Sequence, residues 1–116
     1  MHGETGGPGS AELDFGEFRA TITVDPARSG PNRIELEVMD DGPAAPKLDA
    51  VTFEASLTKP ALGPLEFEAE PDGAGRWHAE QAEFPIPGEW KLRAETRVGE
   101  FELYVATTEI TIGGRN

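Results

Sequence analysis

The chain has 116 residues, of which 22 are acidic, 10 are basic and none is cysteine, so its formal net charge is −12. This charge argues against nucleic acid or anionic lipid as a partner, because both attract clustered Lys and Arg. The lack of cysteine excludes disulfides, thiolate metal sites and thiol nucleophiles. A chain of this length fits one domain that buries about two thirds of its unfolded surface.

No stretch of the sequence is apolar over the ~20 residues that a membrane-spanning helix needs. Residues 1–14 contain four glycines and no periodicity, which predicts a flexible leader and not a secretory signal. We therefore predict a leader over 1–14, a single β-sandwich domain over 15–113 and a tail over 114–116. Any segment that targets or anchors the domain is expected outside this sequence.

From residue 18 onward, apolar and polar residues alternate, which is the pattern of strands that bury one face. Seven such runs are separated by clusters of Gly, Pro, Asn and Asp, the residues that favour turns. The runs cover residues 18–24, 34–38, 51–57, 65–69, 76–80, 90–98 and 101–112. The phase of the last run slips around Ala106 to Thr108, which predicts a β-bulge or a bend there.

Seven short strands that each have one polar face predict an all-β fold, an immunoglobulin-like antiparallel β-sandwich. The two tryptophans, Trp77 and Trp90, fall on inward positions. They can supply the core volume that an inter-sheet disulfide and tryptophan supply in antibody domains. A small closed barrel is the alternative architecture.

The two histidines, His2 and His78, are the candidate metal ligands. His78 lies between the inward residues Trp77 and Ala79, so it points outward, and a lone imidazole favours a surface residue over a metal site. Beside a nearby Glu or Asp it is the internal candidate ligand. His2 lies in the leader and could chelate Cu(II) with the terminal amine if Met1 were removed. Copper is therefore the metal to test, and the sequence assigns no cofactor with certainty.

The residue patterns of common catalytic sites do not occur in this sequence. Outside the leader the serines are Ser29 and Ser56, and neither lies in a G-x-S-x-G turn. No phosphate-binding glycine loop is present. We predict that the domain is not an enzyme, since a small hydrolase would need a pocket with convergent carboxylates.

Four segments occur in a distinctive order between about residues 17 and 112. They are residues 24–42, Leu62-Gly-Pro-Leu65, Gly75-Arg-Trp-His78 and Phe84-Pro-Ile-Pro-Gly-Glu-Trp90. Together they resemble the extracytoplasmic C-terminal domain of bacterial copper-resistance membrane proteins of the CopD/YcnJ type, which shares its fold with YtkA-like and FixH-like domains. The residues that carry the resemblance make turns or fill a core, so they indicate a fold and not a site. They include Pro31, Asn32, Gly63, Pro64, Trp77, Pro87, Gly88 and Trp90.

The resemblance implies an extracytoplasmic location, in the periplasm or at the cell surface, with a tether to a membrane segment outside this sequence. We expect a non-enzymatic accessory domain of a copper-transport or copper-handling membrane protein, acting in protein interaction or weak metal handling. The expected partner is the membrane portion or another extracytoplasmic protein, not nucleic acid, and this sequence itself is not expected to insert into the bilayer.

The alternative function is a purely structural or partner-binding β-sandwich without metal. It predicts an exposed apolar patch or an open edge strand. Proline-rich loops at 43–46 and 85–87 are further candidate contact surfaces.

Overall fold

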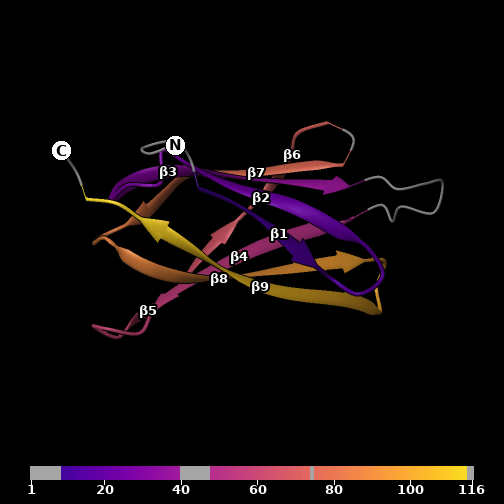
Figure 1. Cartoon of the computed structure of the whole chain (residues 1–116). Helices are drawn as coiled ribbons and strands as arrows, with labels where there is room; N and C mark the ends of the chain where they lie inside the picture. Colours follow the sequence, from indigo (N-terminus) through magenta and orange to yellow (C-terminus); the bar gives the residue numbers. More distant parts are fainter. Residues whose placement is uncertain (1–8, 40–47, 74, 115–116) are drawn as a thin grey trace.

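The computed structural model describes residues 9–39, 48–73 and 75–114, and in these ranges the chain forms two antiparallel sheets packed face to face (Figure 1). In spatial order, the first sheet contains β1 (Gly9–Asp14), β2 (Arg19–Asp25), β3 (Gly30–Met39), β7 (Arg76–Phe84) and β6 (Glu70–Pro71). The second sheet contains β5 (Leu62–Glu68), β4 (Ala50–Leu57), β8 (Gly88–Val98) and β9 (Glu102–Ile112). The predicted all-β antiparallel sandwich is confirmed. Nothing in the described part of the chain is a helix that could cross a bilayer.

The core lies between the two sheets and is built by the alternating residues of the central strands. In β2, β3, β4 and β8 every second side chain is buried, as the sequence pattern predicted. Trp90, Phe53 and Phe84 are the largest fully buried side chains. The Trp90 ring meets Phe84 edge-on at 5.2 Å between centroids, and its Nε1 donates to the Ile86 carbonyl at 3.0 Å. Trp77 is also buried, so both tryptophans point inward as predicted.

The structure contains two strands that the sequence pattern did not predict. Strand β1 lies inside the predicted leader over 1–14, so that prediction is wrong for Gly9–Asp14. These residues pair with β2, and Leu13 is fully buried. The other addition is β6, a two-residue strand that pairs with His78 and Trp77 of β7. Residues 1–8, which include His2, lie outside the described residues, as does the proline-rich loop at 43–46.

Of the bulge or bend predicted around Ala106 to Thr108, the bulge does not occur. The β8–β9 ladder runs without a register shift from the Val98–Glu102 pair to the Gly88–Ile112 pair. A bulge occurs instead in β7, opposite the part of β3 between Asn32 and Ile34, where Gln81 has a φ of 61°. This extra residue restores the inward phase of β7, so the strand continues to Phe84 and does not end at residue 80 as predicted.

The residues that carry the family resemblance take structural positions. Asn32 is buried, and its side chain makes hydrogen bonds to the preceding loop. Gly63 has a φ of 93°, and a Cβ there would lie 2.6 Å from the Ala55 carbonyl oxygen, so only glycine fits. Gly88 begins β8 and packs against Leu57 of β4. The prolines of these motifs are exposed at or near strand starts; they are Pro31, Pro64 and Pro87.

Candidate functional site

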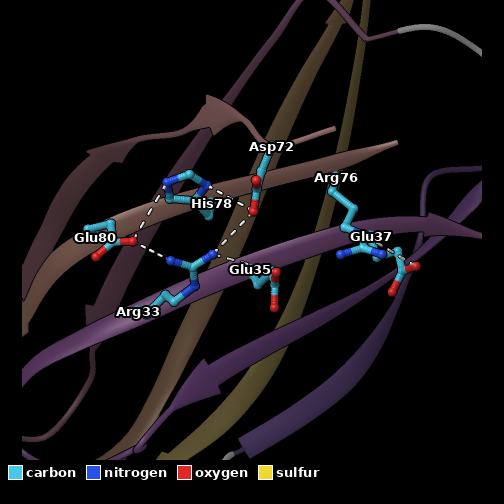
Figure 2. A network of polar contacts seen from close by, with 7 residues as sticks. All are labelled: Arg33, Glu35, Glu37, Asp72, Arg76, His78 and Glu80. Carbon is cyan, nitrogen blue, oxygen red and sulfur yellow. Dashed lines mark hydrogen bonds and ion pairs between the residues drawn. The ribbon is translucent and has the colours of Figure 1, made fainter. Parts of the chain in front are cut away.

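A network of charged side chains covers the outer face of the first sheet where β3 meets β7 (Figure 2). Adjacent strands supply most of it, because outward residues of neighbouring strands lie side by side. We call it the Arg33 cluster, and its members are Arg33 and Glu35 of β3, Asp72 of the turn before β7, and His78 and Glu80 of β7. A separate pair, Arg76 with Glu37 at 3.8 Å, lies next to it on the same face.

Arg33 is the centre of the cluster. Its Nη2 lies 3.2 Å from Oδ2 of Asp72 and 3.7 Å from Oε2 of Glu35, and its Nη1 is bonded to Glu80. The bulge at Gln81 lies opposite Arg33 in the β3–β7 ladder, beside Glu80. One guanidinium therefore bridges three carboxylates that come from β3, β7 and the turn between β6 and β7 (Figure 2).

His78 lies on the outer face, as its parity predicted, but it is not freely exposed. Its side chain keeps only 19% of its accessible surface, since β3 and β6 flank it on both sides. Its Nδ1 lies 3.5 Å from Oδ2 of Asp72 and its Nε2 lies 3.7 Å from Oε2 of Glu80. The Nδ1 atom is buried and has no hydrogen-bond partner in the described structure.

The side chains around His78 do not fit a metal centre. Within residues 9–39, 48–73 and 75–114, no group of three or more His, Cys, Asp or Glu side chains is arranged to hold a metal ion. Both carboxylates beside His78 also contact Arg33, so a cation would have to displace the guanidinium from them. The arrangement is better suited to a set of partly exposed ion pairs, each contributing about 0–1 kcal/mol to stability.

A second surface feature is apolar and lies on the outer face of the second sheet. Phe101 is 93% exposed, Leu103 is 53% exposed and Val105 is 38% exposed. We call these three residues the β9 strip. They share one parity of the chain, whereas the buried residues of β9, such as Ile110 and Ile112, have the other. Because β9 has no bulge, the odd-numbered apolar residues point to solvent.

The surroundings of the β9 strip are mostly acidic at its Phe101 end. Glu100 and Glu102 are exposed on either side of Phe101, and the Asp49 carboxylate accepts a hydrogen bond from the Gly99 N–H at 2.6 Å. Desolvation raises the pKa of the neighbouring Tyr104, and the negative charges of Glu102 and Glu17 raise it further. Tyr104 and Glu102 have the opposite parity to the strip; the Tyr104 hydroxyl contacts Glu102, and its ring packs against Phe18.

The basic residues near the β9 strip belong to the neighbouring strand β8. Arg97 is paired with Leu103 in the ladder and is exposed. Arg93, further along β8, is held by Glu95 and Glu54, and the hydrogen bond to Glu95 is the main cause that raises its pKa. The charge of Arg93 is thus already matched by carboxylates within the sheet.

Comparisons with known proteins find no relative of this chain: no family model matches, and neither a curated protein nor a solved structure does. The resemblance to the copper-resistance membrane proteins rests on the quoted sequence motifs alone.

Of the residues in the Arg33 cluster and the β9 strip, the sequence pattern identified His78 as a candidate site residue. Parity placed His78 outward, but the sequence could not show that Arg33 and Asp72 meet it, because the three residues belong to different segments. The β9 strip was missed. Its signal in the sequence is the phase slip of the last run, for which a bulge or a bend is the predicted explanation.

Proposed function

We propose that this chain is a non-enzymatic, extracytoplasmic accessory module that acts by binding another protein through the β9 strip. The observation that carries the proposal is the exposure of Phe101, at the end of the β8–β9 turn, and of Leu103 and Val105 at the start of β9. A contiguous apolar surface that is bordered by charged residues is typical of a protein-binding site. The extracytoplasmic setting, and a membrane protein of copper transport as the partner, are supported by the sequence resemblance.

The shape of the β9 strip supports a protein as the ligand. Leu103 and Val105 stand on the outer face of the second sheet, about 7 Å apart as alternate strand residues are, and Phe101 precedes them at the end of the turn. Such a row matches an elongated partner and not a compact small molecule, which needs a concave site. Phe101 is largely exposed, and aromatic residues are enriched in the cores of protein interfaces.

Selection of peptide ligands tests the proposed binding surface. We expect a displayed random-peptide library to yield ligands for this chain whose affinity falls about tenfold or more with the double variant Phe101→Ser, Leu103→Ser, because burial of each apolar side chain stabilises a complex substantially. The matched control is Thr107→Ala, Thr111→Ala, which alters exposed outward positions on the same strand. Ligands that bind the serine variant as tightly as the natural chain, or no ligands at all, would contradict the proposal.

A copper titration separates protein binding from metal handling. We expect titration with Cu(II) and with Cu(I) to show no stoichiometric, sub-micromolar site, since Arg33 engages both carboxylates beside His78. His78→Ala should leave the binding curve unchanged, and His2→Ala separates any contribution from the start of the chain. A stoichiometric site that disappears with His78→Ala would overturn the metal-free proposal and support a metal-handling role instead.

A further inference from the structure

We infer that β5 is a second interaction surface, at which a partner's strand of alternating apolar and basic residues adds to the second sheet. This surface is separate from the β9 strip, because β5 and β9 form opposite edges of that sheet. The inference therefore goes beyond the proposed function and does not depend on it. It is carried by an open backbone edge, by inward side chains that remain partly exposed and by outward side chains that are acidic.

The backbone of β5 is paired on only one side among the described residues. Its pairing partner is β4, and after β5 the chain crosses to the first sheet, where β6 pairs with β7. The ladder to β4 shifts register between Leu62 and Leu65, and Pro64 in this part has no N–H. The regular part of the open edge is therefore 65–68. An extended segment can pair with such an edge through its own N–H and C=O groups.

The inward face of β5 is incompletely covered. Leu65 and Phe67 pair with fully buried residues of β4, so they point into the sandwich. Both remain partly exposed, and no residue of β5 is buried, whereas β2, β3, β4 and β8 bury every second residue. The Phe67 ring reaches Phe84 of β7 at 5.9 Å between centroids. An added strand with apolar inward residues would cover Leu65 and Phe67 further, and this burial favours binding.

The outward face of the same edge is acidic. Glu66 and Glu68 are exposed and alternate with the inward residues, so both point to the outer face of the second sheet. Glu66 lies directly opposite Glu54 of β4. Arg93 follows in the same row, one strand further, where Glu54 and Glu95 already engage it. Two carboxylates therefore stand at the open edge, where a Lys or Arg of a neighbouring strand would lie directly beside them.

These features together select an extended basic segment. Apolar residues at its inward positions would extend the core over Leu65 and Phe67. Lys or Arg at its outward positions would pair with Glu66 and Glu68, and cross-strand pairs of opposite charge stabilise a sheet. The net charge of −12 also draws a basic chain towards the domain.

A second copy of this chain is a poor occupant of the edge. Two β5 edges related by a two-fold axis would pair antiparallel, with the outward residues of both copies on one face of the joined sheet. Glu66 and Glu68 of the two copies would then lie beside one another. Like charges that face each other across a strand pair are destabilising.

Short peptides that alternate valine with lysine, with threonine or with glutamate test the inference. Their binding to the isotopically labelled full chain is followed by NMR. We expect the lysine peptide to bind about tenfold or more tightly than the glutamate peptide, with the threonine peptide between them. The largest shifts should occur at the amides of 65–68. Added salt should weaken the lysine complex, because it screens exposed charges.

Amide hydrogen exchange tests whether the lysine peptide adds as a strand. Pairing gives the free N–H groups of the β5 edge a partner, so exchange within 65–68 should slow in the complex. A lysine peptide that is N-methylated at every residue has no N–H to donate and should bind much more weakly. Shifts without slower exchange, together with unchanged binding of the methylated peptide, would show contact through side chains alone and would contradict the inference.

Charge reversal at the edge gives the decisive comparison. We expect Glu66→Lys, Glu68→Lys to remove or invert the preference for the lysine peptide. The matched control is Glu89→Lys, Glu109→Lys, which makes the same change in net charge at exposed outward positions of β8 and β9. The control should retain most of the preference. Equal losses in both variants would mean that total charge selects the peptide, and the inference would be wrong.

The remaining outcomes separate this inference from the proposed function. If the shifts centre on Leu103 and Val105 and disappear with Phe101→Ser, Leu103→Ser, the peptides bind the β9 strip, so the inference is wrong and the proposed function is supported. If no peptide shifts 65–68, the inference is wrong and the β9 strip is unaffected. If sedimentation shows a dimer of the free chain that Glu66→Lys, Glu68→Lys disrupts, a second copy pairs with the edge and the inference is overturned.

Discussion

Replacing Trp90 with alanine is expected to lower the free energy of unfolding by about 3–5 kcal/mol, the range for removal of a large aromatic side chain from a core. Trp90 is fully buried between the sheets and contacts Phe84 edge-on. Its loss leaves a cavity and also leaves the Ile86 carbonyl without the indole donor. Since small domains have a total stability of about 5–15 kcal/mol, chemical denaturation should show a large shift of the midpoint.

Two further variants separate packing from hydrogen bonding at this position. Trp90→Phe retains an aromatic ring and removes the indole N–H, so we expect a smaller loss than for alanine. Lys91→Ala, at the next and exposed position of β8, should change stability by less than about 0.5 kcal/mol. If Trp90→Ala cost no more than Lys91→Ala, the indole would not be a central part of the core, and the packing described here would be wrong.

Most of the sandwich could be predicted from sequence because alternation reports burial on one face of a strand. The pattern located the strands that became β2, β3, β4 and β8, and it placed Trp77 and Trp90 inward. It failed where the burial signal is weak. The glycine-rich residues at the start of the chain led to the prediction of a flexible leader, although Leu13 of β1 is buried. Strand β6 has two residues, too few to show any periodicity. In β7 the extra residue Gln81 broke the phase, so the strand was predicted to end early.

The surfaces were harder to predict than the core. Parity decides only whether a side chain points outward, and it placed His78 correctly. Which groups then surround that side chain depends on the pairing of distant segments, as with Asp72 and Arg33. For the β9 strip, the signal was present in the sequence, but one of its predicted structural causes, a bulge, does not occur. Its phase slip was visible in the sequence, but the ladder absorbed it by exposing Leu103 and Val105 and not by forming a bulge. A phase slip can therefore indicate an interface as well as an irregular strand.

The second large effect is expected at Asn32, which holds the loop between β2 and β3. Its Oδ1 accepts hydrogen bonds from the N–H groups of Ala27 at 2.7 Å and Arg28 at 3.3 Å, and its Nδ2 donates to the carbonyls of Arg28 at 2.8 Å and Gly30 at 2.9 Å. The side chain is buried, and Ala27 has a φ of 64°, which is unusual for a residue other than glycine. We expect Asn32→Ala to lower the free energy of unfolding by about 2–4 kcal/mol, because buried backbone groups lose their partners.

The effect of Asn32→Ala should extend to the end of β9. The same loop is joined to the residue that follows β9 by hydrogen bonds from Gly113 N–H to the Ala27 carbonyl and from Ser29 N–H to the Gly113 carbonyl, both at 2.8 Å. Amide exchange of Ser29 and Gly113 should therefore accelerate in the variant. The matched control is Thr96→Val, which keeps the shape of the side chain. Thr96 is fully buried, and its hydroxyl donates a hydrogen bond to the Tyr104 carbonyl. We expect that control to cost about 1 kcal/mol and to leave the exchange of both amides unchanged.

Asn32→Asp distinguishes the donor half of the side chain from the acceptor half. A carboxylate keeps the two accepted hydrogen bonds but places negative charge against the carbonyls of Arg28 and Gly30, so the ionised form is disfavoured in the folded state. The folded state then binds a proton more tightly than the unfolded state, so the variant loses stability relative to the natural chain as the pH rises. Denaturation at about pH 4 and about pH 7 should show a smaller deficit at the lower pH. A deficit that does not change with pH would mean that the two donated hydrogen bonds contribute little, and that the loop is held by the accepted bonds alone.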